Sequence, residues 1–190
     1  MGDRILRFFE SLVFPGKCLK CGRYRDSTAA AEKPESFFCE ICLQQGIFPI
    51  EPPYCRLCGL PLTNRDETGL CRACRKTPLD LGRVRAAAEY RGLVKDGIHM
   101  LKYQSKLSIA RFLEHLLFQT FVRHYADTPI DLVIPLPLHP GRMRKRGFNQ
   151  AYFLARNFET LYQRAFDRPP TWTLDVRALV RTRKTRPQTG

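Results

Sequence analysis

The chain has 190 residues, with 32 Lys and Arg against 18 Asp and Glu, and a formal net charge of +14. This length accommodates one small module and one domain of ordinary size, and no apolar stretch approaches the ~20 residues of a membrane span, so membrane insertion is not expected. The charge is uneven, because residues 79–190 carry 20 basic and 9 acidic side chains, whereas residues 1–78 carry 12 and 9. We therefore expect a soluble, cytoplasmic protein whose second half attracts phosphate groups.

The first expected element is a helix over residues 3–13, where apolar side chains recur with helical spacing until Pro15-Gly16 ends the pattern. A helix that packs on the domain behind it is favoured over a helix that lies on a membrane surface. Charged residues interrupt the apolar run and no cleavage pattern follows it, so no secretory signal is expected.

Eight cysteines, all before residue 75, form four Cys-x-x-Cys pairs. Two thiolates separated by two residues can bind one ion from a tight turn, and two such turns complete the tetrahedron that zinc prefers; a site closed by four thiolates is structural. Residues 15–78 are thus predicted to hold two structural Zn²⁺ ions, which can contribute on the order of 10–16 kcal/mol to folding. The predicted ligands are Cys18, Cys21, Cys39, Cys42, Cys55, Cys58, Cys71 and Cys74.

Two alternatives to zinc are disfavoured: disulfides need an exported protein, and a redox Cys-x-x-Cys motif usually occurs once, beside a βαβ unit. The ligand pairing is less determined. Gly22 and Gly59 directly follow the first and third pairs, and this repeat favours two tandem ribbons with sequential ligation. An interleaved cross-brace remains open, because spacing alone does not exclude it.

Beyond a linker at Pro78 to Gly82, alternating side chains predict a strand over residues 84–90, which Gly92 breaks. A short helix is expected to end near Lys102. A longer helix is expected from about Leu107 to His124, with Ala110, Leu113, Leu117 and Phe121 facing inward.

The apolar run over residues 131–135 predicts a buried strand, followed by a loop and a helix from about Asn149 to Arg164. A last strand is expected within residues 174–180. Strands that alternate with helices indicate an α/β fold with a parallel sheet and crossover helices.

The basic segment between this strand and the next helix is the candidate site. In open α/β sheets ligands lie beyond the carboxyl ends of strands, and a helix N-terminus offers free N–H groups to an anion. A phosphate site and a solvated basic loop are both compatible with this pattern. The cations concerned are Arg142, Arg144, Lys145 and Arg146.

Three segments resemble the ComF/GntX family of competence proteins: YRGLVKDGIHMLKYQSKLSIARFL, DLVIPLPLHPGRMRKRGFNQAYFLA and LVRTRKTRPQTG. The resemblance covers nearly the whole chain, including the four cysteine pairs. It implies a double zinc ribbon (15–78) and a type I phosphoribosyltransferase-like domain (79–190), which follow the helix expected within residues 1–14.

The resemblance also implies roles for individual residues. Lys102 would be the main charge of the pyrophosphate-side loop. Arg181, Arg183, Gln188 and Thr189 would begin a mobile loop, and no catalytic residue is assigned. The residues implied to face the nucleotide pocket are Arg146, Gly147, Asn149 and Gln150. Arg142 of the basic segment completes the expected substrate- or phosphate-binding set.

The family pattern continues past PQTG to a hydrophobic strand and an acidic pair followed by Thr-Thr-Gly, and the 190 residues contain no such motif. We therefore expect an incomplete phosphoribosyltransferase-like sheet that is catalytically inactive in this form, or a fragment of a longer protein. Mg²⁺ with phosphoribosyl pyrophosphate is expected only with the complete domain.

A binding function is the alternative, as a single-stranded DNA-binding or adaptor protein of DNA uptake, with a DNA-uptake helicase or recombination mediator as partner. Residues 142–190 carry 12 basic and 3 acidic side chains, with Phe148, Tyr152 and Trp172 among them. Packing in a helix is the favoured role of Phe148 and Tyr152. A purely structural zinc protein with a vestigial second domain is the third hypothesis. Of the histidines, only His139 is a weak site candidate; His99, His115 and His124 are expected to be structural or on the surface.

Overall fold

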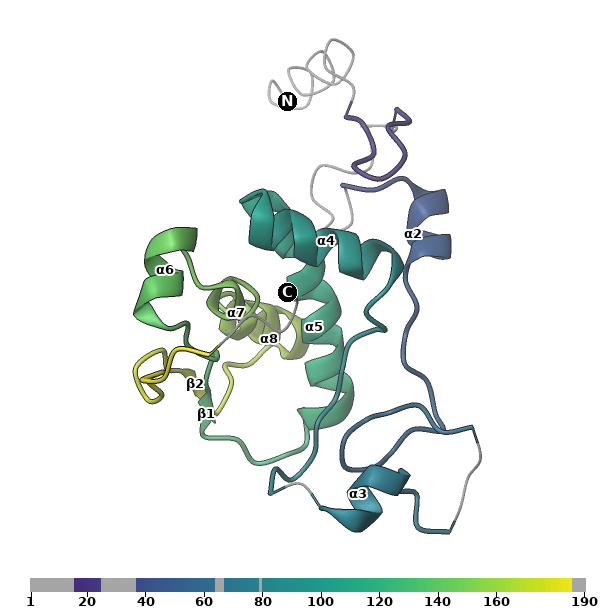
Figure 1. The fold of residues 1–190 in the computed structure, drawn as a ribbon, viewed down its shortest axis with the longest axis vertical. Coiled ribbons are helices and arrows are strands. Elements are labelled where there is room, and N and C mark those ends of the chain that lie inside the picture. Colours follow the sequence, from purple (N-terminus) through teal and green to yellow (C-terminus); the bar gives the residue numbers. More distant parts are fainter. Residues whose placement is uncertain (1–15, 25–36, 64–66, 79, 186–190) are drawn as a thin grey trace.

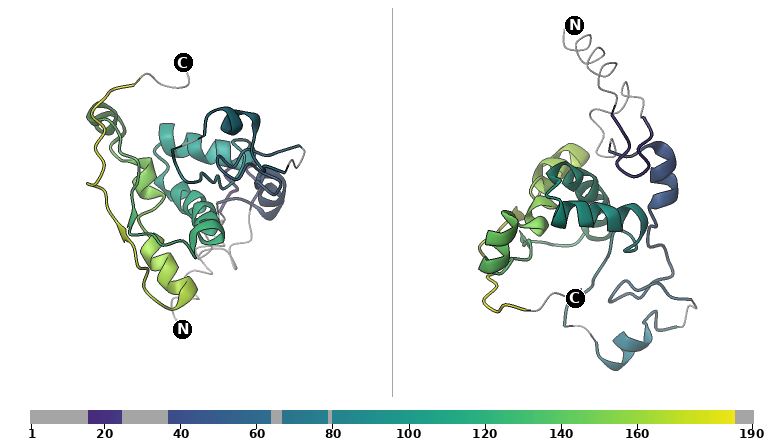
Figure 2. Two further views of the ribbon diagram at one scale, coloured as in Figure 1. Left: turned by 90° about the horizontal axis from the view of Figure 1, so that it is seen from below. Right: turned by 45° about the horizontal axis from the view of Figure 1, so that its top comes forward.

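The computed structural model of the chain describes residues 16–24, 37–63, 67–78 and 80–185. The helix expected over residues 3–13 lies outside the described residues, as do Gln188 and Thr189. In Figures 1 and 2 a central pair of helices, α4 (Gly92–Tyr103) and α5 (Ala110–Tyr125), separates the cysteine-rich segments from the C-terminal elements.

Each half of the cysteine-rich region repeats one local design, a tight turn followed by a short helix. The turns are the Cys18 and Cys55 knuckles, in which the N–H groups of Gly22 and Gly59 donate to the carbonyls of Cys18 and Cys55 at 2.9 Å. Both glycines have positive φ, +71° and +74°, a backbone conformation that glycine adopts without steric cost. The helices are α2 (Glu40–Gly46) and α3 (Arg72–Lys76).

The prediction of a strand over residues 84–90 is wrong. This segment has no regular structure, because its backbone bonds to the cysteine-rich region rather than to a sheet: the Val84 N–H donates to the Leu57 carbonyl at 2.6 Å and the Glu89 N–H to the Phe48 carbonyl at 2.8 Å. Gly92 does not end a strand but begins α4. A Cβ at Gly92 would lie 2.3 Å from the Gly46 carbonyl oxygen, so this close approach of two backbones requires glycine.

The two helices predicted next are confirmed, as α4 and as the turn η1 (Leu107–Ile109) continued by α5. Their contact is the main core, in which Leu93, Leu101, Ile109 and Phe112 are at most 1% exposed. Cys18 and Phe38 of the cysteine-rich region are buried in the same cluster, with the Phe38 ring edge-on to Phe112 at 5.1 Å.

The predicted parallel pairing is confirmed in a small sheet. Strand β1 (Leu132–Val133) pairs with β2 (Thr173–Leu174), with Leu132 opposite Thr173. The last strand therefore overlaps the expected range only at Leu174. A second core packs beneath this sheet, and its buried members are Phe118, Ala155, Phe158, Tyr162 and Trp172.

The connection between the strands differs from the expectation in two ways. The expected loop contains a helix, α6 (Pro140–Arg146), and the expected single helix over 149–164 is broken into α7 (Gln150–Phe153) and α8 (Phe158–Phe166). The break is stabilised by Glu114 of α5, which is 5% exposed and accepts hydrogen bonds from the backbone N–H and Nδ2 of Asn157 at 3.3 and 3.0 Å. A tertiary contact therefore overrides the local helical pattern.

Candidate functional site

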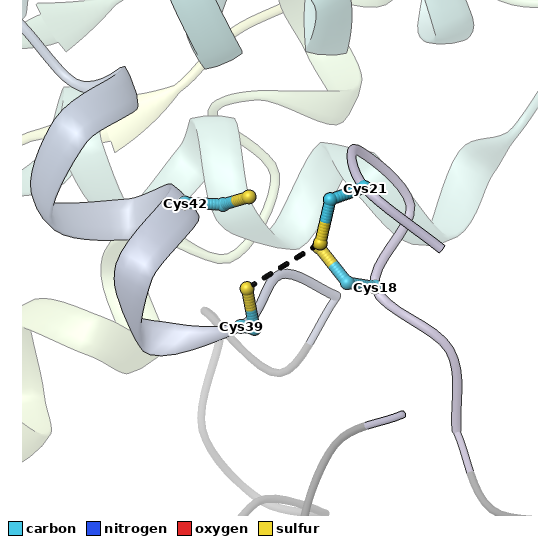
Figure 3. Close-up of side chains that lie close together, drawn as sticks. All are labelled: Cys18, Cys21, Cys39 and Cys42. Carbon is cyan, nitrogen blue, oxygen red and sulfur yellow. Dashed lines mark hydrogen bonds between the residues drawn. The ribbon is translucent and has the colours of Figure 1, made fainter. Parts of the chain in front are cut away.

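The first cysteine cluster joins Cys18 and Cys21 of the first knuckle to Cys39 and Cys42 of α2, and Figure 3 shows the four side chains converging. Their sulfur atoms lie within 4.8 Å of one another, and the Sγ atoms of Cys21 and Cys39 are 3.7 Å apart. Tetrahedral zinc with Zn–S bonds of about 2.3 Å places neighbouring sulfurs roughly 3.8 Å apart. The cluster therefore has the dimensions of a four-thiolate zinc site.

The second cluster repeats this arrangement with Cys55, Cys58, Cys71 and Cys74, and the Sγ atoms of Cys58 and Cys71 are again 3.7 Å apart. Consecutive pairs share a cluster in both cases, so the arrangement is that of sequential ligation and not of an interleaved cross-brace. Four thiolates per cluster are the donor set of a structural zinc site.

The knuckles favour ionised sulfur at their first cysteines. Burial opposes ionisation of Cys18, but hydrogen bonds from the backbone of Cys21, Cys39 and Lys20 outweigh it and lower the pKa of this thiol to about 6. Cys55 follows the same logic, with its pKa lowered to about 6. Burial and the neighbouring sulfurs raise the pKa of Cys42 and of Cys74 to about 12, so ionisation of these two thiols at neutral pH needs the cation.

The basic residues of the candidate site lie on α6, not in a loop. His139 caps this helix by accepting a hydrogen bond on Nδ1 from the Gly141 N–H at 3.1 Å, Pro140 is its first residue, and Gly147 ends it at φ +78°. Proline at the first position and a left-handed glycine after the last turn are typical helix boundaries. His139 thus has a structural role.

The cations of α6 differ in their contacts. Arg142 donates to the Thr185 carbonyl at 2.8 Å and Arg146 to Oε1 of Gln150 at 2.9 Å. Within the ranges that the structure describes, neither Arg144 nor Lys145 has a hydrogen bond or an ion pair, and both are exposed. Two positive charges are therefore free to meet an anion.

Arg146 links α6 to the end of α4, since its Cζ lies 5.7 Å from the ring centroid of Tyr103. Its partner Gln150 is 7% exposed and its Nε2 has no hydrogen-bond acceptor among the described residues. Lys102, which is half-buried in the last turn of α4, is the direct neighbour of Tyr103. The structure thus brings the segments that contain Lys102 and Arg146 together. They meet at Tyr103, a residue that the sequence did not indicate as part of the site.

Three other predicted site residues, Asn149, Arg181 and Arg183, lie apart from this contact or bond to neighbouring groups of the chain. Asn149 donates from Nδ2 to the Leu136 carbonyl at 3.1 Å and accepts the Ala151 N–H at 3.0 Å. That second bond occupies a donor at the start of α7, which has only four residues, so the long helix that was expected to begin near Asn149 and offer its N-terminus to an anion is not formed. Arg181 donates to Oγ1 of Thr185 at 2.7 Å, whereas Arg183 is exposed.

The aromatic residues first considered for stacking on bases are mostly packed inside. Phe148 is 9% and Trp172 4% exposed, so the stacking role of Trp172 is wrong and the packing role of Phe148 is confirmed. Tyr152 is 37% exposed, with its ring edge-on to Phe153 at 6.1 Å.

Comparison with known proteins agrees with this architecture. Residues 9–75 match the family described as "Double zinc ribbon domain". Competence protein ComFC of Bacillus subtilis (strain 168) is 30% identical over 129 residues, which are 65% of this chain and 52% of that protein. The chain carries a double zinc ribbon and is homologous to ComFC.

DNA utilization protein YhgH is a second relative. The Escherichia coli (strain K12) protein is 30% identical over 105 residues, covering 54% of this chain and 45% of that protein. The Salmonella typhimurium (strain LT2) protein is 26% identical over 148 residues, covering 76% and 61%. The chain thus spans about half the length of the first relatives it matches, and no solved structure matches it.

Among the described residues, no helix combines the length and the apolar character that crossing a bilayer requires.

Proposed function

We propose that this ComFC homologue acts in the uptake or utilisation of DNA by binding single-stranded DNA along α6. The names of its relatives, a competence protein and a DNA utilization protein, support this cellular context. The observation that carries the proposal is the pair Arg144 and Lys145, exposed and without partners in the part of the chain that the structure describes. Lys and Arg side chains without a protein partner can neutralise the phosphates of the DNA backbone.

The zinc ribbons have a supporting role in this proposal. Lys20, inside the first knuckle, forms an ion pair with Asp96 of α4 at 2.5 Å, and Cys18 is buried against the α4–α5 core. The first zinc site therefore holds α4, the helix whose end meets α6. A DNA-uptake helicase or a recombination mediator is the expected protein partner.

Salt dependence tests the proposal. The affinity for a fluorescein-labelled oligo(dT) is measured by anisotropy over a range of salt concentrations with the zinc-loaded chain. Contacts to several phosphates make the logarithm of the binding constant fall linearly with the logarithm of salt concentration, by about 0.7 per phosphate contact. A binding constant that does not change with salt, or no binding at low salt, would refute the proposal.

A phosphoribosyl pyrophosphate-like ligand is the second candidate. It is favoured by the buried Nε2 of Gln150, which lies beside the guanidinium of Arg146 and lacks an acceptor among the residues that the structure describes. Phosphate oxygens would supply that acceptor, and Lys102 would add a charge. We expect no turnover from these 190 residues. Calorimetry with phosphoribosyl pyrophosphate, with and without Mg²⁺, and a pyrophosphate-release assay test this candidate; release above background would contradict the expected inactivity.

A further inference from the structure

Three rings form an exposed row on the surface of α4 and the segment before it. They are Tyr90, His99 and Tyr103, and this set is called the aromatic row below. The His99 ring lies 6.5 Å from Tyr90 and 5.4 Å from Tyr103, centroid to centroid, and its Nε2 is 3.1 Å from the Tyr90 hydroxyl. Tyr90 is 56% and Tyr103 63% exposed.

The aromatic row does not contribute to either large core. His99 and Tyr103 are four residues apart on α4 and share its outer face, whereas Leu93, Val94, Gly97 and Leu101 form the buried face of the same helix. Neighbouring aromatic rings that remain in solvent provide flat surfaces on which bases can stack.

The charges around the aromatic row favour a polyanion. The guanidinium of Arg146 lies over Tyr103, and Lys102 and Lys106 lie on either side of this tyrosine in the sequence. The nearby carboxylates are already neutralised, since Asp96 pairs with Lys20 at 2.5 Å and Glu89 with Arg91 at 2.7 Å.

We propose that the aromatic row is a base-stacking surface for single-stranded DNA, with bases against Tyr103 and Tyr90 and phosphates along Lys102, Arg146 and α6. This inference rests on the proposed function and adds how the strand is recognised: unpaired bases expose the faces that the rings need. Duplex DNA, whose bases are already stacked on one another, lacks these faces and would bind through phosphates alone.

The test compares Tyr103→Ala with Tyr24→Ala. Tyr24 is a matched control, because it is also 63% exposed and also carries a cation over its ring, with Lys17 Nζ at 5.1 Å. Anisotropy is measured with oligo(dT), with an abasic oligonucleotide of the same length and with a duplex, and zinc content and thermal melting confirm that each variant is folded.

We expect Tyr103→Ala to weaken oligo(dT) binding about 5- to 150-fold, the equivalent of one lost stack. Tyr103→Phe should retain the affinity and Tyr24→Ala should not change it. The abasic strand should bind the unmodified chain more weakly than oligo(dT) binds Tyr103→Ala, because it also lacks the stack on Tyr90.

Two results would overturn the inference while salt-dependent DNA binding, and so the proposed function, survives. One is an unchanged oligo(dT) affinity in Tyr103→Ala, and the other is a loss of affinity in Tyr103→Ala that is as large for the abasic strand or the duplex as for oligo(dT). If the unmodified chain does not bind oligo(dT) at low salt, both the inference and the proposed function fail.

Discussion

The guanidinium of Arg146 lies over the ring of Tyr103, with Cζ 5.7 Å from the ring centroid. This contact joins the last turn of α6 to Tyr103, the last residue of α4 and the sequence neighbour of Lys102. Because Arg146 also donates to Gln150, a ligand at this position would meet residues from three helices. The candidate surface is therefore a product of how these helices pack.

Removing charge from α6 should weaken DNA binding independently of base sequence. In the double variant Arg144→Gln/Lys145→Gln, two phosphate contacts are lost, and the salt slope for single-stranded DNA should fall by roughly 1.4, since each contact contributes about 0.7. Anisotropy titrations at several salt concentrations measure the slope. Arg72→Gln/Lys76→Gln on α3, which removes two other exposed cations, is the control; equal slopes for both double variants would contradict the role of α6.

Loss of the first zinc site should destabilise the chain more than loss of the second. Cys18→Ser and Cys71→Ser should each reduce the zinc content from two ions per chain to one. Cys18 is buried in the α4–α5 core, whereas Cys71 belongs to a separate cluster with Cys55 and Cys74. We therefore expect Cys18→Ser to destabilise the chain by about 3 kcal/mol or more and to increase amide exchange in α4 and α5.

Cys71→Ser provides the comparison for that prediction. Its effect on amide exchange should be confined to the second knuckle, α3 and the segment that bonds to Leu57. Metal analysis and hydrogen-exchange mass spectrometry give both readouts. Equal loss of protection in α5 in the two variants would show that the sites are not separate.

The buried carboxylate of Glu114 should be needed for the break between α7 and α8. Glu114→Ala leaves the backbone N–H and Nδ2 of Asn157 without their acceptor, and each unsatisfied group costs about 1–3 kcal/mol. Chemical denaturation measures the free energy of unfolding. Asp127→Ala, which removes an exposed carboxylate, should change it by less than about 0.5 kcal/mol; a similarly small effect at Glu114 would contradict the structural role.

His124 should make stability depend on pH. Burial first, then the charges of Arg85, Arg123 and Arg83, lower the pKa of this imidazole below its ordinary 6.5 in the folded chain; Tyr54 packs edge-on against the ring at 5.9 Å. The unfolded chain takes up the proton at 6.5, so stability falls as the pH decreases from 6.5 to the lower folded pKa. Below that value this contribution no longer changes.

The variant His124→Asn isolates this effect, because all other titrating groups, the thiolates included, are common to both proteins. Unfolding free energies measured between about pH 7.5 and 5.5 should fall more steeply for the unmodified chain than for the variant. Parallel curves would show that His124 does not titrate differently in the folded and unfolded states.

Patterns that depend on local chemistry were predictable. The Cys-x-x-Cys spacing and the following glycines indicated the two ribbons, because ligation from a knuckle involves only neighbouring residues. The inward stripe of α5 was also predictable, with Ala110 3% and Leu113 6% exposed. Helix and ligand motifs of this kind depend on side chains within a few positions of one another.

Other features depended on contacts between distant residues. The alternating segment over 84–90 resembles a strand, but its backbone donors find acceptors at Leu57 and Phe48. The periodic segment over 149–164 resembles one helix, but the hydrogen bonds from Asn157 to Glu114 accompany a break between α7 and α8. In both cases a partner far away in the sequence satisfies backbone groups that the local pattern would assign elsewhere.

The sequence by itself determined the donor chemistry of the zinc sites, the positions of the main helices and the concentration of positive charge after residue 142, because these follow from residue type and spacing. Only the tertiary structure decided that zinc ligation is sequential, that Trp172 is buried and that Tyr103 lies under Arg146. Ligand pairing, burial and surface neighbours depend on which segments are in contact in the folded chain. The spacing of residues along the sequence does not determine these contacts.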